Sequence, residues 1–288
     1  MTEHEGTTLG VVGAGTMGAG ISEVAALAGF NVVLNDVSNA ALDSAARRIK
    51  QDLNRSVEKD RITAVQATEA FSRIRLTMSL TDLRPCGCVI EAAIENLPVK
   101  KDLFARLSDI VSDDAILASN TSSFSITSLA SSVRHPERVV GMHFFNPPPV
   151  MKLVEVVRGA RTSDTTLEHS VELARRLGKT PVVCKDTPGF IVNRVARPFY
   201  GEALRLLGEG VASVEEIDRI VKLEGGFRMG PFELMDLIGI DVNYAVTQSV
   251  YEQFFHEPRF RPHPLQRQMV EAGMLGRKTG RGFYTYSS

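Results

Sequence analysis

Three glycines near the start of the chain have the spacing of a phosphate-binding loop. The segment Gly13-Ala-Gly15-Thr16-Met17-Gly18 directly follows a short apolar run and opens a helical stretch. Glycines at these positions permit a tight turn, close approach of the backbone to a pyrophosphate, and close packing of helix on strand. The N-terminus of the following helix offers unpaired N–H groups and a partial positive charge. We therefore expect Gly13, Gly15, Thr16, Met17 and Gly18 to bind a dinucleotide.

An acidic residue, Asp36, ends the second apolar run eighteen residues beyond Gly18. A carboxylate at this place accepts hydrogen bonds from the hydroxyls of an adenosine ribose. The same carboxylate repels a 2′-phosphate, and the following residues Val37, Ser38 and Asn39 bring no cation. NAD is therefore favoured over NADP, by about 2–3 kcal/mol on the scale of charged hydrogen bonds.

A histidine, His143, ends a predicted strand at the edge where doubly wound sheets bind their ligands. His143 and Glu155 are symmetric about Pro149, so a hairpin through residues 146–150 would make them cross-strand neighbours. Glu155 lies in the apolar run Leu153–Val157, where an unpaired carboxylate would be costly. Such a carboxylate would fix the imidazole tautomer and stabilise the imidazolium, so the pair could serve as a general base. A structural histidine and a solvated glutamate are the alternative.

Short apolar runs alternate with helical stretches in the first part of the chain. The predicted strands are Leu9–Val12, Val32–Asn35, Ile74–Thr77, Cys88–Glu91, Ile116–Ser119 and Val139–His143, with Leu153–Val157 and Val182–Cys184 as further candidates. Predicted helices between them include Met17–Ala28, Ala40–Glu58 and Lys100–Val111. This alternation predicts an α/β fold of the Rossmann type, a doubly wound and mostly parallel sheet covered on both faces.

The pattern changes after Lys185, where Thr187-Pro188-Gly189 interrupts the chain. Apolar residues then recur at helical spacing in Ile191–Leu207, Val214–Leu223, Phe232–Phe255 and Leu265–Ala272. Helices without strands predict a smaller all-α domain, which gives the domains 1–186 and 187–288. The stretch Phe232–Ile240 is apolar on nearly every face, so it is either a deeply buried helix or an oligomer contact.

The composition is that of a soluble globular protein and excludes several classes. Of 288 residues, 33 are Lys or Arg and 34 are Asp or Glu, so no basic field attracts nucleic acid or an anionic membrane. No run approaches the ~20 apolar residues of a membrane span. The acidic N-terminal segment 1–8 has no basic or apolar targeting pattern, which predicts a cytoplasmic protein. The three cysteines, Cys86, Cys88 and Cys184, are too few for a disulfide framework or a structural zinc site, so no metal is expected.

Several longer motifs resemble those of the L-3-hydroxyacyl-CoA dehydrogenases. They are Ser119-Asn-Thr-Ser-Ser, His143-Phe-Phe-Asn-Pro, Lys185-Asp-Thr-Pro-Gly-Phe-Ile-Val-Asn-Arg, Gly230-Pro-Phe-Glu-Leu and Gly276-Arg-Lys-Thr-Gly-Arg-Gly-Phe-Tyr. The resemblance runs from Leu9 to Tyr284, and the compact length is similar to that of bacterial single-function members. It implies a dinucleotide-binding domain joined to a helical domain that forms a homodimer. The implied reaction oxidises the 3-hydroxyl of an acyl-CoA to a ketone, with hydride passing to NAD.

The resemblance also implies roles for individual residues. His143 and Glu155 match the family's catalytic pair, while Ser122 and Asn193 match residues that hydrogen-bond the reacting oxygen. Because Asn193 belongs to the helical domain, an interdomain site is expected. Further matches to cofactor contacts are Glu95, Lys100, Asn120, Ser122, Asn146 and Lys278.

Contacts to the CoA part of the substrate are implied for Lys59 and Ser122. Lys59 ends a helix rich in charges, so a solvated helix face is nearly as good an interpretation of this lysine. Glu95, Lys100 and Lys278 have the same alternative. Animal members carry a serine where this chain has Asp52, and an anion there does not help to bind a phosphate.

Three functions are compared. The first is an NAD-dependent dehydrogenase of short 3-hydroxyacyl-CoA such as 3-hydroxybutyryl-CoA, in β-oxidation of fatty acids or butanoate metabolism. The second takes 3-hydroxyadipyl-CoA from aromatic-acid catabolism, and the third is a non-catalytic NAD-binding structural protein. A non-CoA sugar acid is a further alternative to the second function. The related 3-hydroxyacid dehydrogenases that act without CoA carry a Lys-x-x-Asn pair, but Phe190 stands where that lysine would be, which argues against them. Because His143 and Glu155 are both present, the non-catalytic alternative is disfavoured. We expect an acyl-CoA substrate and no nucleic-acid or membrane partner.

Overall fold

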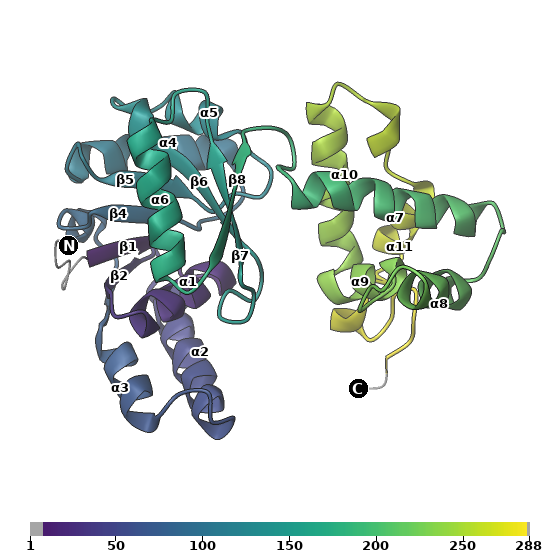
Figure 1. Cartoon of the computed structure of the whole chain (residues 1–288), viewed down its shortest axis with the longest axis horizontal. Helices are drawn as coiled ribbons and strands as arrows, with labels where there is room; N and C mark the ends of the chain where they lie inside the picture. Colours follow the sequence, from purple (N-terminus) through teal and green to yellow (C-terminus); the bar gives the residue numbers. More distant parts are fainter. Residues whose placement is uncertain (1–7, 287–288) are drawn as a thin grey trace. The chain divides into compact units, whose positions relative to one another are not determined.

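The computed structural model describes residues 8–286, so all but the last residue of the N-terminal segment considered above lies outside it. The chain divides into two compact units between Thr187 and Pro188. All strands of the described residues belong to the first unit, and the second unit is helical (Figure 1).

The first unit is built on an eight-stranded sheet in the order β3-β2-β1-β4-β5-β6-β7-β8. Only β6 and β7 pair antiparallel; all the other neighbours are parallel. The strands are β1 (Thr8–Val12), β2 (Asn31–Asn35), β3 (Ile74–Thr77), β4 (Cys88–Glu91), β5 (Ile116–Ser119), β6 (Val139–Phe144), β7 (Leu153–Arg158) and β8 (Thr180–Lys185). The strand order reverses between β1 and β4, which places a ligand-binding switch point at the carboxyl ends of these strands.

Helices cover both faces of the sheet (Figure 1). The helices are α1 (Thr16–Leu27), α2 (Asn39–Glu58), α3 (Ala64–Ser72), α4 (Leu97–Ile110), α5 (Ile126–Ala130) and α6 (Asp164–Arg176), with 3₁₀ turns at Leu80–Leu83 and Pro136–Arg138. Apolar side chains of α1, α2, α3 and α6 share one core, which includes Val140 and Met142 of β6. Gly141 lies between these two and faces Ile126 of α5 instead. Alternate residues of β6 therefore point to opposite layers of helices.

Local sequence signals start these helices. Ser38, Asn96 and Ser163 each accept a hydrogen bond from a backbone N–H in the first turn of α2, α4 and α6, respectively. Such caps satisfy donors that a helix N-terminus would otherwise leave unpaired.

The second unit packs its helices around a core of its own, which includes Leu204, Phe232, Met235 and Ile240. Its helices are α7 (Val192–Gly208), α8 (Val214–Leu223), α9 (Pro231–Ile238), α10 (Ile240–Gln253) and α11 (Pro264–Glu271), with 3₁₀ turns at Pro258–Phe260 and Arg277–Thr279.

The predicted single helix over Phe232–Phe255 is wrong. Gly239 has a φ of 102° and separates α9 from α10. Glycine accepts this conformation, which side-chain-bearing residues rarely adopt. The apolar stretch before it is partly buried and partly exposed, since Phe232 is fully buried whereas Leu237 and Ile238 are 50% and 43% exposed.

Candidate active site

The glycine loop joins β1 to α1 at the switch point of the sheet. Gly13 has a φ of 101°, and a Cβ there would lie 2.5 Å from the carbonyl oxygen of Ala92. A Cβ on Gly18 would lie 1.7 Å from the carbonyl oxygen of Gly13. At Gly15 no heavy atom of the described part of the chain lies within 4 Å of a Cβ. The outer glycines are thus required by packing, and the middle one leaves backbone open, as a pyrophosphate cradle requires.

Asp36 follows β2 and holds the glycine loop. Its Oδ2 accepts a hydrogen bond from the Ala14 N–H at 2.7 Å, and its Oδ1 accepts one from the Ser38 N–H at 2.9 Å. A carboxylate has about four lone-pair sites, so both oxygens can still accept hydroxyl donors. A cavity of about 280 Å³ opens beside Asp36 and is also lined by Gly13 and Met78. The loop, the carboxylate and this cavity fit the adenosine and pyrophosphate of NAD.

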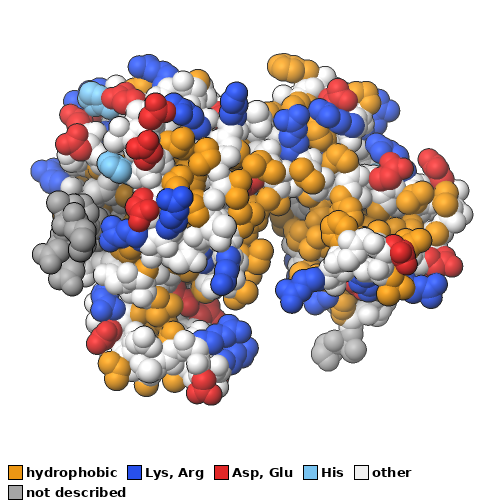
Figure 2. All heavy atoms as spheres, viewed as in Figure 1, with side chains coloured by type: hydrophobic (Ala, Val, Ile, Leu, Met, Phe, Trp, Pro, Cys, Tyr) orange, Lys and Arg blue, Asp and Glu red, His pale blue; other side chains and the backbone are white. Residues whose placement is uncertain are grey.

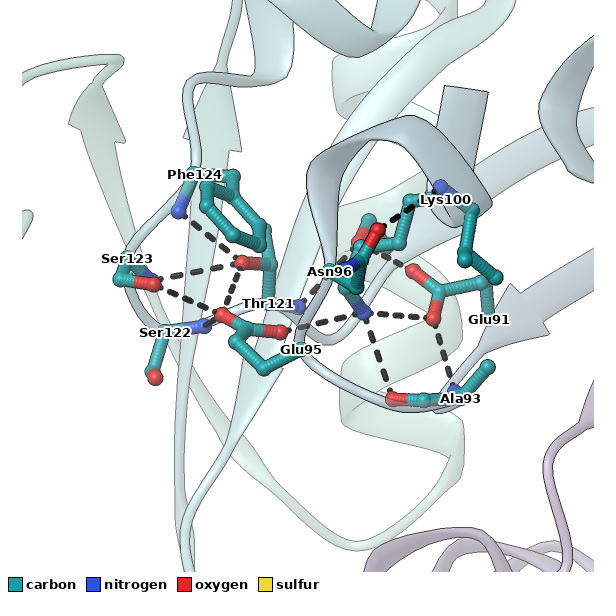
Figure 3. Close-up of polar contacts among 11 residues, drawn as sticks. Glu91, Ala93, Glu95, Asn96, Lys100, Thr121, Ser122, Ser123 and Phe124 are labelled. Atoms are coloured by element: carbon teal, nitrogen blue, oxygen red, sulfur yellow. Dashed lines mark hydrogen bonds and ion pairs between the residues drawn. The ribbon is translucent and has the colours of Figure 1, made fainter. Parts of the chain in front are cut away.

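A buried ion pair lies beyond β4 (Figure 3). Lys100 Nζ lies 2.6 Å from Glu91 Oε1, and the two side chains are 2% and 0% exposed. The same ammonium lies 3.1 Å from Glu95 Oε2. The alternative that Lys100 is a solvated helix-end charge is therefore wrong. One cation between two carboxylates fixes the loop between β4 and α4, which runs beside the glycine loop at Ala92.

Glu95 connects this ion pair to the loop after β5 (Figure 3). Its Oε1 accepts hydrogen bonds from Thr121 Oγ1 at 2.6 Å, Ser123 Oγ at 2.8 Å and the Ser122 N–H at 3.3 Å. Burial raises the pKa of Glu95, but the Lys100 ammonium and the hydroxyl donors outweigh burial and bring the pKa below its ordinary value. Glu95 is therefore ionised at neutral pH, and the Ser122 side chain points away from it (Figure 3).

Two more hydrogen bonds tie neighbouring strand ends together. Ser119 Oγ donates to Glu91 Oε2 at 2.6 Å, and Asn120 Oδ1 accepts from the Phe144 N–H at 2.9 Å. Sequence reasoning had assigned no role to Glu91 or Ser119. The sequence does indicate a role for Glu91, because this residue ends the buried apolar strand β4, where a carboxylate needs a partner.

His143 and Glu155 are direct cross-strand neighbours in the antiparallel β6–β7 pair, as their symmetry about Pro149 predicts. Nδ1 of His143 lies 2.7 Å from Oε2 of Glu155, and the two residues are 6% and 1% exposed. The His143 ring lies against Phe145, with centroids 4.5 Å apart. In the tautomer that donates from Nδ1 to Glu155, Nε2 keeps the lone pair that a base needs.

The other predicted residues lie further from this group or belong to the second unit. Asn146 is exposed in the loop after β6, and Lys59 is exposed at the end of α2. Asp52 pairs with Arg55 at 3.2 Å. In the second unit, Asn193 lies in the first turn of α7. Lys278 lies 2.6 Å from Asp241.

Residues 8–286 include no helix long and apolar enough to cross a membrane. They also contain no group of three or more His, Cys, Asp or Glu side chains placed to hold a metal ion.

Oxidation of an alcohol by a nicotinamide requires a dinucleotide cradle and a base at one edge of the sheet. The glycine loop and the His143–Glu155 pair lie at this edge, as carboxyl-terminal ends of parallel strands do. The class of protein that this fold and site define is the NAD-dependent dehydrogenases.

Comparisons with known proteins give the family. Residues 8–187 match the family model "3-hydroxyacyl-CoA dehydrogenase, NAD binding domain", and residues 189–286 match "3-hydroxyacyl-CoA dehydrogenase, C-terminal domain". The chain belongs to the 3-hydroxyacyl-CoA dehydrogenase family.

Individual relatives support this membership over almost the whole chain. A 3-hydroxyadipyl-CoA dehydrogenase of Escherichia coli is 50% identical over 97% of this chain, which spans only 59% of that longer protein. A 3-hydroxybutyryl-CoA dehydrogenase of Bradyrhizobium diazoefficiens is 49% identical, with 96% of this chain and 94% of that protein covered. The crystal structure of (S)-3-hydroxybutyryl-CoA dehydrogenase from Ralstonia eutropha has a TM-score of 0.94 at 47% identity, covering 98% and 99% of the two chains.

Proposed function

We propose that this protein interconverts (S)-3-hydroxyacyl-CoA and 3-oxoacyl-CoA with NAD, and that its acyl chains are short, as in 3-hydroxybutyryl-CoA. The observation that carries the proposal is the buried pair of His143 and Glu155, 2.7 Å apart, at the carboxyl edge of a sheet whose first loop fits a dinucleotide. The relatives named 3-hydroxybutyryl-CoA dehydrogenase, which match this chain over nearly their whole length, favour this substrate.

His143 acts as the general base in the direction of oxidation. Nε2 takes the proton of the 3-hydroxyl, and Glu155 stabilises the imidazolium that forms. The resemblance assigns Ser122 and Asn193 to hydrogen bonds with the reacting oxygen. Bound NAD supplies the hydride acceptor.

The proposed contacts to the cofactor fall into three groups. The glycine loop, with Gly13, Gly15, Thr16, Met17 and Gly18, takes the pyrophosphate, and Asp36 takes the adenosine ribose. The further contacts that we propose are Glu95, Lys100, Asn120, Ser122, Asn146 and Lys278. Since Lys100 is 1% exposed and engaged by two carboxylates, it acts by holding Glu95 in place.

The CoA part of the substrate lies against Lys59 and Ser122 in this proposal. Lys59 ends α2 and is exposed, so its ammonium is accessible to a phosphate. Asp52, the acid that stands where animal relatives have serine, pairs with Arg55 at 3.2 Å one to two turns before Lys59.

The protein works as a homodimer through its second unit and in the cytoplasm, within fatty-acid or butanoate metabolism. Large apolar side chains are exposed on this unit, among them Ile220 at 60%, Leu223 at 73% and Leu237 at 50%. Figure 2 shows hydrophobic side chains gathered over the helical unit. Exposed apolar area of this kind marks protein interfaces, and sedimentation equilibrium measures whether the mass is twice that of one chain.

A second candidate is the dehydrogenation of 3-hydroxyadipyl-CoA, which the 50% identical E. coli relative is named for. Both candidates use the same base and cofactor, and they differ in the length of the acyl chain and in what lies at its far end.

The experiment that tests the proposal follows the oxidation of NADH with acetoacetyl-CoA. His143→Gln should lower kcat by about 10²–10⁴-fold, the range of general acid–base catalysis, while NADH binding stays intact. His135→Gln is the matched control, because His135 pairs with Glu137 at 3.2 Å in an exposed position. Near-normal turnover by His143→Gln would remove this histidine from its role, and no turnover by the unmodified protein would favour a non-catalytic NAD-binding protein.

A further inference from the structure

An arginine that pairs with no acidic side chain of the described residues is buried in the second unit. Arg197 lies on α7 and is 5% exposed. Its Nε donates to the carbonyl oxygen of Asn193 at 3.2 Å, and its Nη1 donates to the carbonyl oxygen of Asn243 at 2.8 Å and to Thr247 Oγ1 at 2.9 Å. The guanidinium carbon is 5.0 Å from the centroid of the Tyr200 ring. All these partners are neutral.

The charge of Arg197 is consequently uncompensated within residues 8–286. Burial lowers the pKa of Arg197 to about 10, and the only opposing influence comes from Tyr200, so the side chain is a cation at neutral pH. Arg138, the other buried arginine of the described chain, reaches Asp113 at 4.0 Å. A buried ion without a counter-ion is costly, and proteins pair such groups.

The surroundings of Arg197 also have more hydrogen-bond donors than acceptors. Asn243 and Gln266 are each 1% exposed, and Gln266 Nε2 donates to Asn243 Oδ1 at 2.7 Å. Among residues 8–286, Nδ2 of Asn243 is buried without a partner, and the hydrogen bonds of Arg197 come from its Nε and Nη1. A carboxylate would supply both the missing acceptors and the missing negative charge, since guanidinium binds it with two parallel hydrogen bonds.

Helix geometry relates Arg197 to the reacting end of the substrate. Asn193 and Arg197 are four residues apart, so they share one face of α7, and long helical side chains lean toward the N-terminus. The hydrogen bond from Arg197 Nε to the Asn193 carbonyl follows that direction. One helical turn is about 5.4 Å, which is comparable to the length of a chain of a few carbons.

We propose that Arg197, together with Asn243, binds a carboxylate at the far end of the acyl chain, so that the enzyme prefers 3-hydroxyacyl-CoA esters of dicarboxylic acids to methyl-ended chains of equal length. The inference rests on the proposed function, because it takes Asn193 as the residue that binds the reacting oxygen. A four-carbon acyl group ends before Arg197 and is still a substrate, but it gains nothing from the cation.

The test compares two acyl groups of equal length that differ only at the far end. Rates of NAD reduction are measured with 3-hydroxyadipyl-CoA, which ends in a carboxylate, and with 3-hydroxyhexanoyl-CoA, which ends in a methyl group. We expect kcat/KM to favour the carboxylate by at least about tenfold, the size of one charge-assisted hydrogen bond. In Arg197→Met this ratio should fall to about one or below, mainly through a higher KM for 3-hydroxyadipyl-CoA.

Two further variants separate recognition from packing. Arg197→Lys keeps the cation but loses the planar fork, so part of the preference should survive. Arg205→Met is the control on the same helix, because Arg205 is 38% exposed and pairs with Glu202 at 2.9 Å. Its ratio should equal that of the unmodified enzyme.

Three results would overturn the inference. In the first, the unmodified enzyme shows no preference for the substrate that ends in a carboxylate. In the second, Arg197→Met and Arg197→Lys lower kcat/KM equally for the two substrates. In the third, the methionine variant does not fold and Arg197→Lys has the same ratio of kcat/KM values as the unmodified enzyme. A change of sedimentation mass in Arg197→Met with an unchanged ratio would assign the missing carboxylate to a second copy of the chain. Turnover of neither substrate, nor of 3-hydroxybutyryl-CoA, would instead defeat the proposed function itself.

Discussion

Glu23 is a buried carboxylate whose protonation should make the stability of the first unit depend on pH. It lies on α1 and is 1% exposed, and its Oε2 has no hydrogen-bond partner within the described part of the chain. Burial, and then the negative charge of Asp52, raise the pKa of Glu23 to about 8, although Lys179 acts in the opposite direction. A cavity of about 40 Å³ adjoins it, lined also by Arg48 and Asp52 of α2 and by the loop Pro147–Pro149.

The sign of the effect follows from which state holds the proton. Unfolded Glu23 releases its proton near pH 4.5, whereas the folded protein keeps it until about pH 8. Between these values the folded state binds one more proton, so the free energy of unfolding falls as the pH rises. Each pKa unit corresponds to about 1.36 kcal/mol. The loss between pH 4.5 and pH 8 is therefore on the order of 3–5 kcal/mol, and below pH 4.5 the group contributes nothing.

Glu23→Gln removes this loss, because glutamine has nearly the same shape and stays neutral. Urea unfolding at pH 5 and pH 8 measures the free energy of unfolding of the variant and of the unmodified protein. We expect the variant to be more stable by several kcal/mol at pH 8 and by much less at pH 5. Glu69→Gln is the control, since Glu69 lies on α3, is 57% exposed and pairs with Arg73, the residue that follows this helix. If Glu23→Gln and the unmodified protein lost stability in parallel from pH 5 to pH 8, the reasoning would be refuted.

Three other variants test the site. Asp36→Ala should raise KM for NAD more than KM for the acyl-CoA, because it removes the ribose acceptor and the partner of the Ala14 N–H; equal effects in steady-state kinetics would contradict the ribose assignment. Lys100→Met leaves Glu91 buried without a cation and should cost about 3–5 kcal/mol in urea unfolding, most of which the double variant with Glu91→Gln should recover. Glu155→Gln should lower kcat about 10²–10³-fold with NADH binding retained, since an amide neither stabilises imidazolium nor selects the tautomer, and a rate within threefold of normal would speak against the pair.

The fold and the central pair were predictable because they depend on local patterns. The strands β3, β4 and β5 begin and end where short apolar runs predict. The contact between His143 and Glu155 follows from hairpin symmetry alone, since residues equidistant from the turn face each other across an antiparallel pair.

Contacts between elements that are distant in sequence were not predictable in the same way. The partner of Glu91 is Lys100, on a helix nine residues later, and its second partner is Ser119 on another strand. No periodicity encodes such a meeting, because it depends on how α4 packs against the strand ends. For the same reason, sequence analysis left a solvated helix-end charge open as an alternative to a cofactor contact for Lys100, and only the structure shows that Lys100 is buried.

The side chains discussed above are charged groups buried among apolar residues. The partners that each one finds determine its role. Glu155 pairs with His143 and Glu91 pairs with Lys100, so burial fixes the geometry of both pairs. Glu23 has an oxygen without a partner, so burial favours its neutral form. Arg197 is still a cation near pH 7, and no acidic side chain of residues 8–286 is seen to pair with it, which leaves a requirement for a counter-ion. A carboxylate on the substrate satisfies that requirement, and an acyl chain that ends in a methyl group does not.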